Sequence, residues 1–139
     1  MEPIMIFHIT IKREDITVLR SKNAKVTFIP FNGTVDSPLF KGTVRPGAAD
    51  VQVTNAAGIR HMNANYIFEG VDQNNEPCHL YVNNHGYFEP DHNPDPFHAC
   101  PTFISDSIVL NDYLSSPHFR AEGHGTSNGV DILIYDTNM

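Results

Sequence analysis

The chain has 139 residues, a length that favours one domain covering residues 1–139. Hydrophobic residues make up 40% of it and aromatic residues 10%, which supports a buried core and excludes a chain disordered throughout. The net charge of −7 argues against nucleic-acid binding, because a protein that grips phosphate backbones needs clustered Lys and Arg side chains.

The N-terminal residues lack the basic leader and long apolar core of a signal peptide. No stretch approaches the ~20 apolar residues of a membrane span. We therefore expect a cytoplasmic protein with no membrane partner. Two cysteines, Cys78 and Cys100, are too few to build a disulfide scaffold.

Short segments rich in β-branched and aromatic residues follow one another along the chain, with Gly, Pro and Asn turns between them. In chain order, the expected strands are residues 5–11, 24–29, 39–45, 50–54, 59–71, 78–88, 118–123 and 130–135. Only residues 105–114 could form a short helix, behind a Ser or Asp cap. The pattern predicts an all-β fold, a single closed antiparallel β-barrel of about eight to ten strands.

The proline-rich segment 89–99 differs from its surroundings because it is polar and shows no strand or helix period. Such a segment is typical of a surface loop. We expect it to be an exposed and mobile excursion near one mouth of the barrel.

The two longest strands flank Asn74-Asn75, which reads as a hairpin turn. Alternation across this turn places Tyr66 on the same face as Tyr81, Asn83 and His85. Rings with polar tips are typical of small-molecule pockets. The alternative is an outer face on which these side chains are half-exposed, and a one-residue bulge would exchange the two faces.

Several short motifs, taken in order, resemble one family of small proteins. They are Phe31-Asn32-Gly33-Thr34, residues 39–44, Pro46-Gly47-Ala48-Ala49-Asp50, residues 66–72, Leu80-Tyr81-Val82-Asn83, Pro101-Thr102-Phe103, Leu110-Asn111 and residues 130–135. Their order and spacing, across residues 4–137, resemble the family catalogued as domain of unknown function 3237.

This resemblance implies a closed, calycin-like antiparallel barrel and brings no biochemical activity with it. It places Asp50 and Asn111 at motif positions of the family. The chain departs from the family pattern at Ala48, where glycine is usual, and at Val51, where an aromatic residue is usual.

Eight histidines in an acidic protein raise the question of a metal site. None of them shows the paired spacing of zinc ligands, so we predict neither a metal nor another cofactor. The candidate acid and base groups are Asp50, Glu69 and His85, because a carboxylate facing a dry interior titrates high and can move a proton. Alternatively, Asp50 only closes the turn after Pro46-Gly47.

The leading hypothesis is a barrel that binds a small, partly apolar molecule in its interior. The expected ligand-binding residues are Asp50, Tyr66, Tyr81, Asn83, His85 and Asn111. The alternatives are a cofactor-independent isomerase, cyclase or lyase that uses an interior carboxylate with His85, and a fully packed barrel that acts in assembly. The sequence leaves open whether the chain forms a homo-oligomer.

Overall fold

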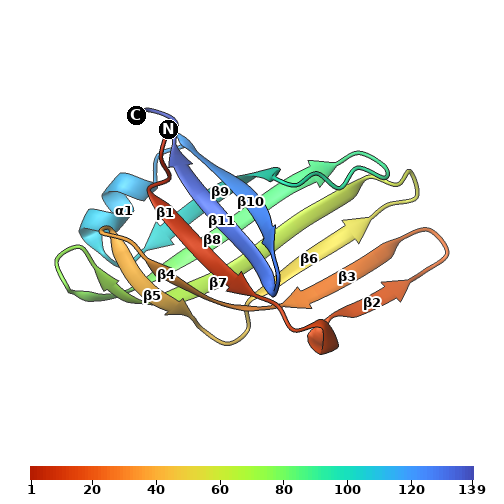
Figure 1. The fold of residues 1–139 in the computed structure, drawn as a ribbon, viewed down its shortest axis with the longest axis horizontal. Coiled ribbons are helices and arrows are strands. Elements are labelled where there is room, and N and C mark those ends of the chain that lie inside the picture. The colour runs from red at the N-terminus through yellow and green to blue at the C-terminus, as the bar shows by residue number, and fades with distance from the viewer.

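The computed structural model describes all 139 residues as eleven strands, one α-helix and one turn of 3-10 helix (Figure 1). The strands are β1 (Met5–Thr10), β2 (Thr17–Arg20), β3 (Lys25–Pro30), β4 (Asn32–Asp36), β5 (Phe40–Val44), β6 (Ala49–Thr54), β7 (Arg60–Asp72), β8 (Pro77–Phe88), β9 (Phe97–Ser105), β10 (Phe119–Thr126) and β11 (Gly129–Asp136). The helices are η1 (Arg13–Asp15) and α1 (Ile108–Leu114), the second of which lies within the predicted segment.

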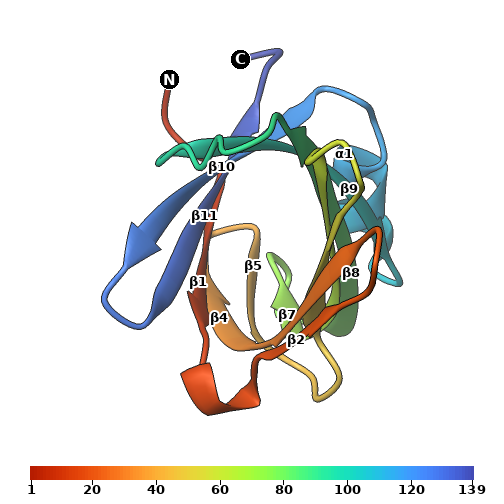
Figure 2. The same ribbon diagram turned by 90° about the vertical axis from the view of Figure 1, so that its right-hand side faces the viewer.

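Eight strands close into an antiparallel barrel in the order β7-β5-β4-β1-β11-β10-β9-β8, with β8 pairing back to β7. The predicted closed barrel is therefore confirmed. Three further strands, β6, β3 and β2, extend the sheet beyond it. Figure 2 views the barrel from the end where these strands lie. No helix has the length and apolar character that a membrane span requires.

Strand β7 is the branch point of the sheet because it is 13 residues long and serves two neighbours on one edge. Its first half, residues 60–65, pairs with β6, and its second half, residues 68–72, pairs with β5. The other edge pairs with β8 along most of its length. The extra strands therefore belong to one end of the barrel.

The hairpin between β7 and β8 differs from the prediction by one residue. The N–H of Asp72 donates to the carbonyl of Glu76 at 3.0 Å, which leaves three residues in the loop, and Asn75 takes the left-handed conformation with φ of 59°. An odd loop places Tyr66 opposite Val82. Residues directly opposite each other share a face, so the face predicted for Tyr81, Asn83 and His85 is wrong.

One end of the barrel, which we call the packed end, is filled with large apolar side chains. The ring of Phe68 is fully buried, 4.8 Å from that of Phe7 and 6.1 Å from that of Phe40 between centroids. Helix α1 adds Leu110 and Leu114, which are 1% and 2% exposed, to the same core. Figure 1 shows α1 at this end, on the opposite side from the β2–β3 hairpin.

The other end, which we call the cavity end, carries segment 89–96 between β8 and β9. This segment is exposed at nearly every residue. It lies at the rim, since Arg60 donates to the carbonyl of His92 at 3.4 Å and Pro90 approaches Gly58. The predicted place of this loop, near a mouth, agrees with the structure for residues 89–96, and its mobility stays a prediction. Residues 97–99, which were predicted to belong to the loop, form the start of β9, where Ala99 is buried.

Candidate functional site in the barrel interior

Asp50 points into the cavity end of the barrel from β6. It lies opposite Ala64 on β7 and opposite Ile29 on β3, so all three share the inner face. Its Oδ2 accepts a hydrogen bond from Gln52 Nε2 at 2.8 Å. Its Oδ1 is buried and has no hydrogen-bond partner.

Burial raises the pKa of the Asp50 carboxyl above its ordinary value, because a low-dielectric surrounding disfavours the charged form. The hydrogen bond from Gln52, a bond from the Asn63 backbone and the charges of Arg60 and His61 act in the opposite direction and are weaker. The carboxyl therefore sits in surroundings that favour its neutral form more than water does.

Asn84 is a second polar group without a complete set of partners. It faces inward from β8, opposite Ala64, and is 2% exposed. Its Oδ1 is buried and accepts no hydrogen bond. Buried polar atoms are nearly always hydrogen-bonded, so two orphaned oxygens on one inner row mark this part of the barrel.

Tyr66 completes the polar part of this site, which we call the interior site: Asp50, Tyr66 and Asn84. The Tyr66 ring packs against Phe31 at 5.0 Å and Phe68 at 5.5 Å between centroids. Burial and the nearby charge of Asp50 raise the pKa of its phenol. Tyr66 therefore stays neutral and lies where the packed end meets the cavity.

A cavity of about 50 Å³ lies against the interior site. Apart from Asp50, Tyr66 and Asn84, its lining is apolar: Ile9, Ile11, Ile29, Phe31, Met62, Ala64, Phe97, Val130 and Ile132. Phe97 has room to lie there because Gly123 has no side chain: an added Cβ would lie 2.2 Å from the ring. An apolar wall with a few converging polar groups is the usual composition of a ligand site.

The structure places some of the predicted site residues inside the barrel and others on its outer face. Asp50 and Tyr66 come together inside the barrel. Tyr81, Asn83 and His85 lie on the outer face of β8, where Asn83 Nδ2 donates to Asn63 Oδ1 at 2.7 Å and Tyr81 donates to Asn65. His85 is therefore no partner for an interior carboxylate.

Asn111 also lies away from Asp50. It belongs to α1 at the packed end, and its Oδ1 accepts the backbone N–H of Ser105 at 3.0 Å. This bond ties the helix to the end of β9. The predicted place of Asn111 near Asp50 is wrong, because α1 packs against the core of the packed end, whereas Asp50 lines the cavity at the other end.

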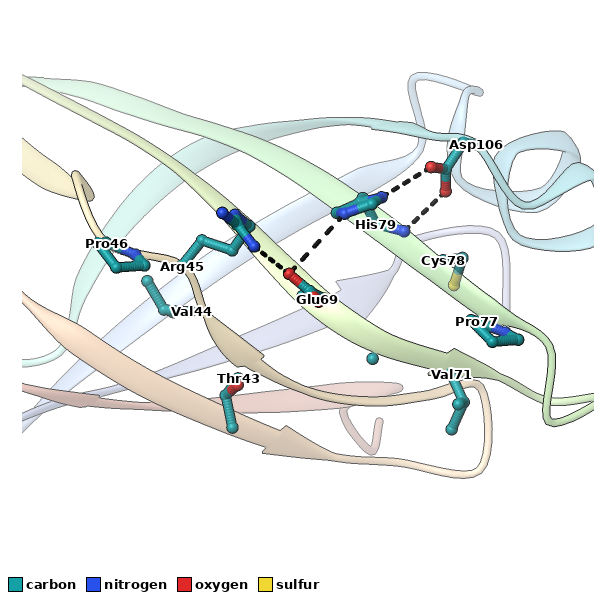
Figure 3. A pocket seen from close by; sticks show the side chains of 11 residues that line it. Thr43, Val44, Arg45, Pro46, Glu69, Val71, Pro77, Cys78, His79 and Asp106 are labelled. Atoms are coloured by element: carbon teal, nitrogen blue, oxygen red, sulfur yellow. Dashed lines mark hydrogen bonds and ion pairs between the residues drawn. The ribbon is translucent and has the colours of Figure 1, made fainter.

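Glu69, the third predicted acid, lies on the outer face in a group that we call the outer network: Arg45, Glu69, His79 and Asp106. Arg45 contacts Glu69, and His79 Nε2 lies 3.9 Å from Glu69 Oε2 (Figure 3). Asp106 accepts both the backbone N–H of His79, at 2.7 Å, and its Nδ1, at 2.8 Å. Both bonds lower the pKa of Asp106, and the bond from the backbone N–H has the larger effect.

The outer network lines an open groove of about 560 Å³, much wider than the interior cavity. Its charged groups are at least half exposed and already paired with one another. Exposed ion pairs contribute little to the free energy of folding. Because the charged groups of the outer network are already paired, none of them needs a ligand as a partner. The interior site, which has orphaned oxygens, is therefore the stronger candidate.

The two cysteines lie on opposite faces of the sheet and are both free, Cys78 buried and Cys100 exposed. Burial, followed by the charges of Asp72 and Asp106, raises the pKa of the Cys78 thiol to about 11. A thiol with such a pKa is a poor nucleophile at neutral pH. No three His, Cys, Asp or Glu side chains converge closely enough to hold a metal ion.

Sequence reasoning missed Asn84, Gln52 and Arg60. Gln52 orients Asp50, and Arg60 Nη1 donates to Gln52 Oε1 at 3.2 Å while its guanidinium lies 4.4 Å from the centre of the Phe88 ring. A three-residue loop at residues 73–75 would have placed Asn84 inside the barrel. Asn75 could have indicated this loop length, since asparagine readily adopts positive φ at the end of three-residue loops.

The fold and the interior site define a small antiparallel β-barrel with a polar group inside an apolar wall. The chain belongs to the family described as "Protein of unknown function (DUF3237)", whose sequence model matches residues 1–98. The family resemblance expected from the motifs is confirmed. No curated protein is detectably similar to the chain.

Solved structures share the fold at low sequence identity. A protein with unknown function from Clostridium acetobutylicum ATCC 824 has a TM-score of 0.75 at 21% identity, covering 96% of this chain and 93% of its own. A conserved protein of unknown function from Rhodopseudomonas palustris gives the same values. A beta-barrel like protein from Acinetobacter baumannii AYE has a TM-score of 0.73 at 19% identity, covering 96% and 92%.

Proposed function

We propose that the barrel binds a small, partly apolar molecule at the interior site. The observation that carries this proposal is the cavity itself, in which buried oxygens of Asp50 and Asn84 lack partners within an apolar wall. Natural cores rarely keep such atoms unpaired. A ligand that occupies the cavity would cover the apolar wall and pair these oxygens together.

The volume of the cavity limits what enters it. About 50 Å³ is more than the roughly 10–15 Å³ that a cavity needs to hold one water molecule, but is far below the 300–1,000 Å³ of a drug-sized pocket. Asp50 is largely but not completely buried, so the cavity end is not sealed. We infer that a polar head group of a few atoms enters the cavity while the rest of the ligand lies toward the mouth, near Phe31 and Phe97.

Methyl NMR tests this proposal directly. Protein labelled at isoleucine methyl groups is titrated with phenol, aniline and toluene, three small aromatic molecules of the same shape. We expect shifts at Ile9, Ile29 and Ile132, which line the cavity, and none at the exposed Ile104 on the outer face. If no probe shifts the cavity methyls selectively, the interior is not a binding site.

A cavity-filling substitution provides the matched test. Ala64 forms the floor of the cavity between Asp50 and Asn84, and Ala64→Val adds two methyl groups there. We expect this variant to lose probe binding at least tenfold. The control is Tyr81→Phe, which changes a ring on the outer face of the same hairpin and leaves binding unchanged.

Proton transfer by Asp50 is the second candidate function, as in a cofactor-independent isomerase, cyclase or lyase. The observation that favours it is the burial of Asp50, which raises the pKa of its carboxyl and makes it a better base once ionised. A carboxyl-carbon NMR titration of Asp50 tests this candidate. A pKa at or below the ordinary aspartate value would remove its basis.

A further inference from the structure

The interior site contains information about the chemistry of its ligand, because its two orphaned atoms are of one kind. Asp50 Oδ1 and Asn84 Oδ1 are both oxygens that accept hydrogen bonds. An ionised carboxylate has no proton to donate, and a carboxamide oxygen only accepts. While Asp50 is ionised, a ligand with acceptors alone would leave both oxygens unpaired.

The two oxygens approach the cavity from opposite sides of Ala64. Asp50 and Asn84 are the residues opposite Ala64 on its two neighbouring strands, β6 and β8. Strands lie about 4.8 Å apart, so the two Cβ atoms are roughly 10 Å apart across the small Ala64 side chain. A single polar group held above Ala64 lies between both side chains.

The orientation of Asp50 is set from outside the cavity. Arg60 donates to Gln52, and Gln52 donates to Oδ2 of Asp50 at 2.8 Å. Arg60 is itself held against the Phe88 ring. This chain of contacts occupies one carboxylate oxygen and leaves the other, Oδ1, buried without a partner in a residue that lines the cavity.

We propose that the ligand of the interior site carries a hydrogen-bond donor, a hydroxyl or an amine, on a small apolar body. A hydroxyl donates its one proton to Asp50 Oδ1 or Asn84 Oδ1, whereas an amine, with two N–H groups, can donate to both. The inference rests on the proposed function and adds the chemical class of the ligand. Hydroxyl and amine groups both supply the required N–H or O–H, whereas ethers, ketones and hydrocarbons do not.

The three probes separate this inference from the proposed function. Phenol, aniline and toluene carry O–H, NH₂ and CH₃ on the same ring, so their affinities differ by the donor. We expect phenol or aniline to bind at least tenfold more tightly than toluene, which is 1.4 kcal/mol. Which of the two binds more tightly distinguishes a hydroxyl ligand from an amine ligand.

The outcomes that overturn the two claims differ. Equal binding of all three probes at the cavity methyls would overturn the donor requirement and leave the proposed function standing. Absence of any selective shift at those methyls would overturn both.

Substitution of Asn84 separates a binding role from a structural one through the melting temperature. Loss of a structural residue would lower it, whereas removal of an unpaired binding residue should raise it. Asn84→Leu replaces the orphaned amide with an apolar group of similar size. We expect the preference for phenol over toluene to fall by at least threefold and the melting temperature to rise by a few degrees, because an unpaired buried acceptor is removed. A lower melting temperature with unchanged preference would contradict the proposal.

The neighbouring residue supplies the control for this substitution. Asn83→Leu makes the same chemical change on the outer face of β8, where Asn83 bonds to Asn63 and Asn65. It should leave the preference unchanged. If Asn84→Leu fails to fold, Asp50→Asn is the second variant: it keeps the shape of the side chain, and loss of the carboxylate charge should weaken phenol binding more than toluene binding.

Discussion

The two ends of the barrel differ in the side chains that fill their interior. At the packed end, aromatic and aliphatic side chains such as Phe40, Phe68 and Leu80 are almost completely buried, and α1 adds Leu110 and Leu114 to the same core. At the cavity end, two inward positions hold Asp50 and Asn84, whose oxygens are unpaired. The difference indicates that the packed end contributes most of the free energy of folding. The polar cavity at the other end lowers the contribution of that end, because buried oxygens without partners are unfavourable.

The largest expected effect that tests this comparison is at the packed end. Phe68→Ala removes a fully buried ring that touches three other aromatic rings, and should lower the free energy of unfolding by about 3–5 kcal/mol. Phe97→Ala at the cavity end should cost only about 1–3 kcal/mol, since Phe97 is half-buried. Urea denaturation measures both, and equal losses would contradict the comparison.

A smaller effect is expected where Phe97 lies over Gly123. In Gly123→Ala, the new Cβ would overlap the Phe97 ring at 2.2 Å, and such overpacking costs about 1–3 kcal/mol. Adding Phe97→Leu should recover part of the loss, because the smaller side chain relieves the contact. A double-mutant cycle in urea measures this coupling, and simple additivity of the two losses would show that the ring does not depend on Gly123.

Two aspartates, one at each end, should respond to pH with opposite signs. The hydrogen bond from Ser107, at 2.6 Å, lowers the pKa of Asp72 in the hairpin loop, so its stabilising contribution is present above the unfolded pKa, near 3.9, and is lost as the pH falls through the folded value. Burial raises the pKa of Asp50, so its contribution is present below the unfolded pKa and is lost as the pH rises through the folded value.

This difference in sign leads to a paired measurement at neutral pH. Asp72→Asn should destabilise the protein, whereas Asp50→Asn should leave its stability unchanged or raise it. Thermal unfolding of both variants between pH 3 and pH 7 measures the two contributions. A stability loss at neutral pH from Asp50→Asn as large as that from Asp72→Asn would show that Asp50 has a structural role.

The smallest effect is expected on the outer face. Tyr81→Phe removes the hydrogen bond to Asn65, 2.7 Å long, without disturbing either end of the interior. The net value of such a bond is about 1 kcal/mol or less at a partly exposed position. Urea denaturation should show a loss within this range, and a larger loss would mean that the outer polar face contributes to stability as much as the core does.

Much of the architecture could be predicted from local patterns. Alternation of β-branched and aromatic residues, interrupted by Gly, Pro and Asn, predicted most of the strands, and the short helix behind Ser107 was predicted from its cap. Three strands were missed. Strand β2 is exposed and shows little alternation, β4 begins with an Asn-Gly pair typical of turns, and β9 begins inside the proline-rich segment and contains a proline itself. The interior position of Asp50 was expected from the family resemblance, which places it at a motif position, and not from local pattern.

The sequence by itself therefore determined the class of fold, the closed antiparallel barrel, because strand period and turn residues are local properties. Only the tertiary structure decided which side chains face the interior. That outcome depended on one residue in the loop between Asp72 and Glu76, since a change of one position in register moves every side chain of a strand to the other face. The same shift that removed Tyr81, Asn83 and His85 from the interior placed Asn84 on the inner face, across Ala64 from Asp50, where the two orphaned oxygens form the candidate site.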